Sequence, residues 1–85
     1  MAIFTSDGKK LINVEYDNIP QLNDMVDNMR VISTDKKSDD EYALFLQELN
    51  GDICCYVLDE IYIIGKVSGF ENLVKAIESW NNNEI

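Results

Sequence analysis

Carboxylates are the commonest chemically active side chains in this sequence of 85 residues. Sixteen Asp and Glu stand against seven Lys and Arg, which gives a net charge of −9. Carboxylates can act as general acids and bases, or bind a metal ion when a loop brings several together. Asp35, Asp39, Asp40 and Glu41 could hold a metal ion loosely, but the sequence has no calcium loop of the form D-x-[DN]-x-[DN]-G. A solvated acidic loop is the favoured interpretation, so we predict neither a metal site nor a cofactor.

The sequence lacks the other groups that most often perform catalysis. It contains no histidine, which removes the commonest general base, the Ser–His and Cys–His pairs and a frequent zinc ligand. It also has neither a GxxxxGK[ST] loop nor a GxGxxG element. We therefore predict that the protein is not an enzyme.

The two cysteines, Cys54 and Cys55, are adjacent and lie in an apolar run. Neighbouring side chains on a strand point to opposite faces, so these thiols are not expected to bridge each other. Buried free thiols are predicted, which suggests a reducing compartment. The sequence shows no apolar signal segment at its start and no run near the ~20 apolar residues of a membrane span. These features predict a cytoplasmic protein, in the host cytoplasm if it is encoded by a phage.

The acidic residues concentrate in two windows that contain no basic residue. One window lies between Lys10 and Arg30 and the other between Lys37 and Lys66, and together they hold eleven of the sixteen acids. Such a surface repels nucleic acid and anionic membranes but attracts basic proteins. Carboxylates two residues apart on a strand lie ~7 Å apart, which is on the scale of phosphate spacing. The residues predicted to bind a partner in place of phosphates are Asp24, Asp27, Asp39, Asp40, Glu41, Asp59 and Glu60.

Two hairpins are predicted from alternation and turn residues. Residues 2–5 and 10–16 flank a turn in which Gly8 can adopt positive φ. Residues 41–49 are apolar on both faces, which indicates a strand covered on both sides. Asn50 and Gly51 then form the strongest hairpin signal in the sequence and lead into a strand at residues 53–58.

The remaining sheet segments are shorter. Residues 31–32 are expected to begin a strand, and residues 61–64 are expected to form a separate one after the acidic pair Asp59 and Glu60. Residues 34–40, TDKKSDD, are charged and have no apolar anchor, which predicts a mobile loop.

Two amphipathic helices are predicted. In residues 19–29 the apolar side chains recur at helical spacing after Asn18 as a cap and Pro20 in the first turn. In residues 69–81 a second apolar stripe follows Ser68 and Glu71, which match a capping box. The predicted order ββαβ(β)ββα describes one α+β domain over residues 1–85, with two helices packed on a small antiparallel sheet of four to six strands.

In size, charge and α+β character the sequence resembles small acidic phage and mobile-element proteins that inhibit host nucleic-acid enzymes, and also immunity proteins that block nuclease toxins. The first resemblance implies an inhibitor that docks on the basic nucleic-acid-binding surface of a host enzyme, such as a restriction or CRISPR nuclease. The second implies an immunity protein or antitoxin that neutralises a basic toxin. A third hypothesis is an accessory or assembly domain that forms a homo-oligomer, such as a homodimer, through exposed apolar residues or through a sheet edge, which the strands at residues 42–46 and 61–64 could present.

Overall fold

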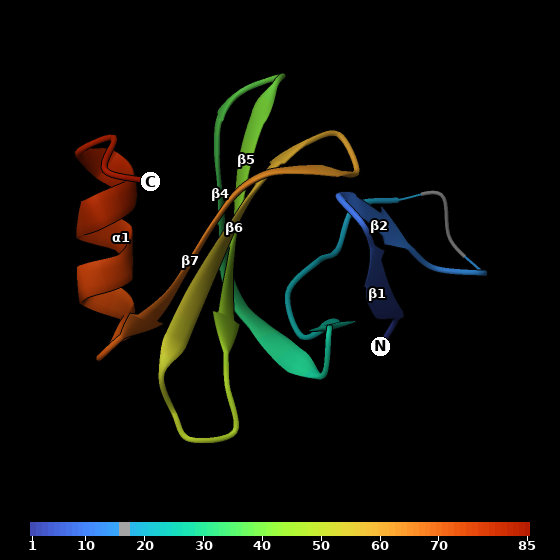
Figure 1. Ribbon diagram of the computed structural model, residues 1–85, viewed down its shortest axis with the longest axis horizontal. Helices are drawn as coiled ribbons and strands as arrows, with labels where there is room; N and C mark the ends of the chain where they lie inside the picture. Colours follow the sequence, from blue (N-terminus) through green and yellow to red (C-terminus); the bar gives the residue numbers. More distant parts are fainter. Residues whose placement is uncertain (16–17) are drawn as a thin grey trace.

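The computed structural model describes residues 1–15 and 18–85. Within these residues, seven strands close into a barrel in the order β1-β2-β7-β6-β5-β4-β3 (Figure 1). The strands are β1 (Ile3–Asp7), β2 (Lys10–Ile12), β3 (Met25–Val26), β4 (Met29–Ser38), β5 (Glu41–Gln47), β6 (Ile53–Asp59) and β7 (Tyr62–Phe70), and the helix is α1 (Leu73–Asn81). Strand pairs are antiparallel except β1 and β3, which run parallel where the barrel closes.

The predicted α+β fold, with two helices on a small sheet, is wrong. The described residues form a barrel with one short helix, because the segment predicted as the first helix contains left-handed residues that an α-helix excludes. Asn23, Asp27 and Asn28 have φ values of 71°, 50° and 67°. Asp27 and Asn28 form a two-residue turn between β3 and β4, where Val26 pairs with Met29. Positive φ at both turn residues is what a type I′ hairpin requires, and Asn and Asp tolerate it.

The second predicted helix is confirmed, but it begins later than expected. Its N-cap is Asn72, whose side-chain oxygen accepts a 3.0 Å hydrogen bond from the Lys75 backbone N–H. The predicted cap, Ser68, lies inside β7 instead, because β7 continues along β6 as far as the Ile53–Phe70 pair. The local capping signal was therefore overridden by strand pairing.

The charged segment at residues 34–40 is also not a loop. Strand β4 continues to Ser38 and pairs with β5, with Asp35 opposite Ala43, so only Asp39 and Asp40 remain in the turn. Both predicted hairpins and the separate last strand are confirmed. Gly51 has a φ of 92° in the β5–β6 turn. The predicted second strand ends at Ile12 rather than at residue 16, and Tyr16 lies outside the described residues.

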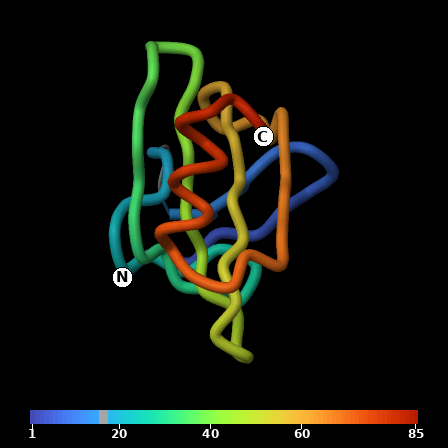
Figure 2. Tube along the Cα trace, turned by 90° about the vertical axis from the view of Figure 1, so that its left-hand side faces the viewer, coloured from blue at the N-terminus to red at the C-terminus, as the bar shows by residue number. Residues whose placement is uncertain are grey.

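Two apolar clusters hold the fold together, one inside the barrel and one between the barrel and α1. Side chains alternate between them along β5 and β6, so Leu44 and Leu46 face inward while Ala43 and Phe45 face the helix. Figure 2 shows α1 lying over these strands. The prediction that β5 is covered on both faces is therefore confirmed.

The cysteines follow the same alternation. Cys54 belongs to the interior cluster and Cys55 to the cluster under the helix, and both are buried free thiols as predicted. None of the helical residues described here forms a segment long and apolar enough to cross a membrane.

Candidate acidic docking end

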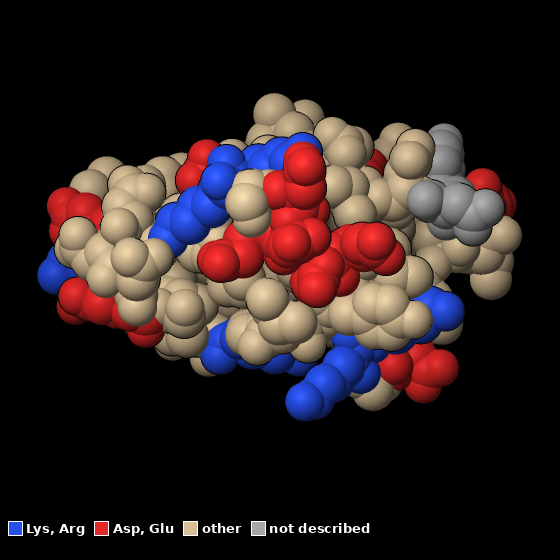
Figure 3. Space-filling model, turned by 90° about the horizontal axis from the view of Figure 1, so that it is seen from above, with Lys and Arg blue, Asp and Glu red and all other residues tan. Residues whose placement is uncertain are grey.

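Five of the seven predicted acidic residues come together at one end of the barrel. Asp39 and Asp40 form the β4–β5 turn, Glu41 begins β5, Asp59 ends β6 and Glu60 lies in the β6–β7 turn. The two turns are neighbours because β5 and β6 are paired up to this end, where Tyr42 lies opposite Leu58. Figure 3, seen from above, shows a cluster of acidic side chains over this part of the molecule. We call Asp39, Asp40, Glu41, Asp59 and Glu60 the acidic end.

Little positive charge neutralises the acidic end. Lys36 Nζ lies 3.2 Å from Asp39 Oδ1, but the Asp39 side chain is 98% exposed, and exposed pairs of this kind contribute at most ~1 kcal/mol. The neighbouring Lys37 is directed to the helix, where it donates hydrogen bonds to the Trp80 carbonyl and, at 2.8 Å, to Asn83 Oδ1. Its Nζ lies 4.0 Å from the centre of the Trp80 ring. In the described part of the chain, no other ion pair involves the acidic end.

The other two predicted residues hold the N-terminal strand in place. Asp24 accepts backbone hydrogen bonds from Ala2 at 2.9 Å and from Gln21 at 2.8 Å. Asp27 accepts hydrogen bonds from the Ser6 backbone N–H at 2.8 Å, from the Ser6 hydroxyl and from the Tyr56 hydroxyl at 2.8 Å. These bonds tie β1 and β6 to the β3–β4 hairpin, beside the parallel β1–β3 pair that closes the barrel. Asp24 and Asp27 therefore do not belong to the acidic end.

The surroundings of Asp27 change its acidity. Burial opposes its ionisation, but the hydrogen bonds from the Ser6 side chain, the Ser6 backbone and Tyr56, together with the charge of Lys66, outweigh burial and lower the pKa of this carboxyl. Burial and the hydrogen bond to Asp27 raise the pKa of the Tyr56 hydroxyl. Asp27 is therefore held as an anion and Tyr56 as a neutral donor.

The fold separates the acidic residues of the larger window, which lies between Lys37 and Lys66 and contains no basic residue. Its remaining acids, Glu48 and Asp52, flank the β5–β6 turn at the opposite end of β5 and β6. The number of acidic residues in this stretch of sequence is therefore larger than the number that lie together on one surface.

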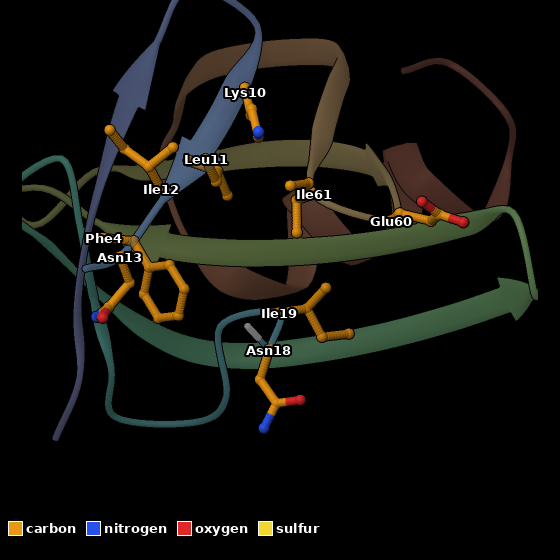
Figure 4. A pocket seen from close by; sticks show the side chains of 9 residues that line it. All are labelled: Phe4, Lys10, Leu11, Ile12, Asn13, Asn18, Ile19, Glu60 and Ile61. Carbon is orange, nitrogen blue, oxygen red and sulfur yellow. The ribbon is translucent and has the colours of Figure 1, made fainter. Parts of the chain in front are cut away.

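Sequence reasoning missed a cavity of about 660 Å³ beside the acidic end. Figure 4 shows the side chains around it, which come from β1, β2, the β6–β7 turn and the segment before β3. The described residues that line it are Phe4, Lys10, Leu11, Ile12, Asn13, Asn18, Ile19, Glu60 and Ile61. No local sequence pattern predicts this cavity, because the residues that line it are far apart in the sequence.

The geometry defines a small β-barrel with an acidic end next to a cavity that both apolar and polar side chains line. In the residues that the structure describes, no group of three or more His, Cys, Asp or Glu side chains is placed to hold a metal ion. Comparison of the chain with protein-family models, with curated proteins and with solved structures gives no match.

Proposed function

We propose that this protein is a non-enzymatic inhibitor whose acidic end docks on the basic nucleic-acid-binding surface of a partner enzyme. The observation that carries the proposal is the convergence of five carboxylates from two adjacent hairpin ends, with one exposed lysine paired among them. A concentrated negative surface accelerates encounter with a basic protein and selects against acidic ones.

The hairpins give these charges a defined spacing. Neighbouring paired strands lie ~4.8 Å apart, and the ends of β5 and β6 place Glu41 and Asp59 on adjacent strands. Such distances are comparable with the spacing of phosphates along a nucleic acid. A groove lined by Lys and Arg could therefore accept the acidic end in place of its usual ligand. An immunity protein for a nuclease toxin would use the same surface, so the two functions differ in the partner rather than in the mechanism.

A matched pair of variants tests this proposal by affinity capture from a host lysate at low salt. In the first variant the acidic end is neutralised by Asp39→Asn, Asp40→Asn, Glu41→Gln, Asp59→Asn and Glu60→Gln. The control neutralises five carboxylates elsewhere, by Glu15→Gln, Glu48→Gln, Asp52→Asn, Glu71→Gln and Glu78→Gln. Both variants lose five negative charges, so any difference in the proteins they capture depends on where the carboxylates lie and not on the total charge.

We expect wild type and control to retain nucleic-acid-binding proteins that added DNA releases, and the acidic-end variant to retain them at least about tenfold less. Retention should fall as salt rises, because exposed charges more than ~8–10 Å apart are screened near physiological ionic strength. Equal losses in both variants, or retention that DNA and salt leave unchanged, would contradict the proposal.

Self-association is a second candidate function, favoured by exposed apolar residues on the outer face of the first hairpin and just after it. Ile3, Ile12 and Val14 are 62%, 40% and 101% exposed. The predicted self-association through a free strand edge is not possible at residues 42–46, because β5 is paired with β4 on one side and β6 on the other. Sedimentation equilibrium of wild type and Ile3→Ser/Val14→Ser tests this alternative: a dimer that the double substitution dissociates would support it, and a monomer at all concentrations would exclude it.

A further inference from the structure

The cavity beside the acidic end has the size and lining of a binding pocket. Its volume of about 660 Å³ lies within the ~300–1,000 Å³ usual for pockets that accept a small molecule or a side chain. Phe4 and Leu11 are buried beneath it, while Ile19 and Ile61 are partly exposed around it and Ile12 is exposed at its edge. In Figure 4 Phe4, Leu11, Ile19 and Ile61 surround a common space, whereas Asn18 and Glu60 point outward.

The cavity is continuous with the acidic end. Glu60 lines the cavity and also belongs to the acidic end, and Ile61 follows it in the same turn. A partner that covers Asp59 and Glu60 therefore meets the apolar walls directly beside the carboxylates. The charge around the cavity is asymmetric, because Lys10 also lines it, on β2.

We propose that the cavity receives an apolar side chain from the partner protein, in a segment whose Lys or Arg residues lie on the acidic side of that anchor. This inference rests on the proposed function, because the same partner contacts the acidic end. Charge complementarity determines the orientation: Glu60 attracts the cationic residues of the segment and Lys10 repels them. Binding energy in protein interfaces is concentrated in buried anchors that are surrounded by polar contacts, which matches this combination of pocket and charged end.

The acidic end and the cavity make separable contributions to binding of the partner. Exposed charges mainly change the association rate and its dependence on salt, whereas a buried anchor mainly changes the dissociation rate. Peptides of identical charge can therefore report the cavity alone.

The test uses two capped, fluorescently labelled pentapeptides, Lys-Lys-Leu-Lys-Lys and Lys-Lys-Ala-Lys-Lys, titrated with the full protein at low and at physiological salt. We expect the leucine peptide to bind about tenfold more tightly than the alanine peptide, since its larger side chain buries more apolar surface. Both affinities should fall as salt rises, but their ratio should remain the same because the peptide charge is the same. The methyl resonances of Ile19 and Ile61 should shift only with the leucine peptide.

Variants of the cavity wall provide the controls. Ile19→Ala and Ile61→Ala should each reduce the preference for leucine at least about threefold, because each shortens an apolar side chain that faces the cavity. Val74→Ala removes an apolar side chain that is 63% exposed on α1 and should leave the preference unchanged. The acidic-end variant should weaken both peptides equally and preserve their ratio.

These measurements separate failure of the inference from failure of the proposed function. Equal affinity of the two peptides, or a preference that survives both cavity variants, would overturn the inference while leaving the acidic end intact. Binding of both peptides that neutralising the acidic end does not weaken would overturn the proposed function. A dimer of this protein that Ile19→Ala dissociates would identify a second copy as the occupant and would also overturn the inference.

Discussion

The indole Nε1 of Trp80 donates a 2.6 Å hydrogen bond to Asp35 Oδ2, which joins the C-terminal helix to β4. Trp80 is only 1% exposed, and Lys37 from the same strand covers its ring and binds its carbonyl. Asp35 and Lys37 alternate with Lys36 along β4, so one face of this charged strand contacts the helix. This contact explains why a segment without apolar residues is a strand rather than a loop.

The Trp80–Asp35 hydrogen bond should contribute measurably to stability. Asp35→Ala removes the acceptor of the indole N–H and should lower the free energy of unfolding by about 1 kcal/mol, because Asp35 is exposed and water can replace part of the lost hydrogen bond. In a Trp80→Phe background the same change should cost much less, because the donor is already absent. Urea denaturation of the four proteins in this double-mutant cycle measures the coupling. A cost of Asp35→Ala that is equal in both backgrounds would show that the hydrogen bond contributes nothing.

Substitutions of Asn28 distinguish the observed turn from the predicted helix. Asn28 has a φ of 67°, so Asn28→Gly should maintain or raise stability, while Asn28→Ala should lower it by about 1 kcal/mol. A helix at this position would give the opposite order, since alanine favours helices and glycine does not. Thermal denaturation followed by circular dichroism ranks the three proteins. Greater stability of Asn28→Ala than of Asn28→Gly would contradict the turn.

Asp27 should make the barrel sensitive to acid. Its pKa in the folded protein lies below the ordinary value near 3.8, because hydrogen bonds and Lys66 outweigh burial. The ionised side chain therefore stabilises the fold above pH ~4, and this contribution is lost as the pH falls through the folded pKa. The stability difference between wild type and Asp27→Asn should be constant near neutral pH and shrink below pH ~4. Asp40→Asn, at an exposed turn position, is the control, and an Asp27 difference that does not depend on pH would refute the assignment.

Both cysteines should resist modification while the protein is folded. Burial raises the pKa of Cys54 to about 11 and that of Cys55 to about 12, so little of the reactive thiolate exists near neutral pH. Cys54 is 4% exposed and Cys55 is fully buried, so Cys54 should react first with an aromatic disulfide reagent. Labelling of Cys54→Ala and Cys55→Ala identifies each thiol. Native rates as fast as those in urea would show that the thiols are accessible.

Several elements could be predicted from local residues because their geometry is local. Asn50 and Gly51 specify a turn whatever the rest of the chain does, and the alternation around Cys54 and Cys55 identifies a strand with two covered faces. The helical spacing in residues 19–29 was misleading, since the same apolar residues also suit a segment that turns twice. The left-handed conformations of Asn23 and Asn28 are what separate the two arrangements.

By itself, the sequence determined the excess of acid, the absence of histidine, the buried thiols, two hairpins and the existence of the C-terminal helix. Only the tertiary structure decided which acids lie together. Pairing of β5 with β6 brings Glu41 beside Asp59, nearly twenty positions away in the sequence, while hydrogen bonds from Ser6 and Tyr56 assign Asp27 to the closure of the barrel. Strand order and partners from distant segments have no local signature, so neither the acidic end nor the cavity beside it could be recognised before the chain was folded.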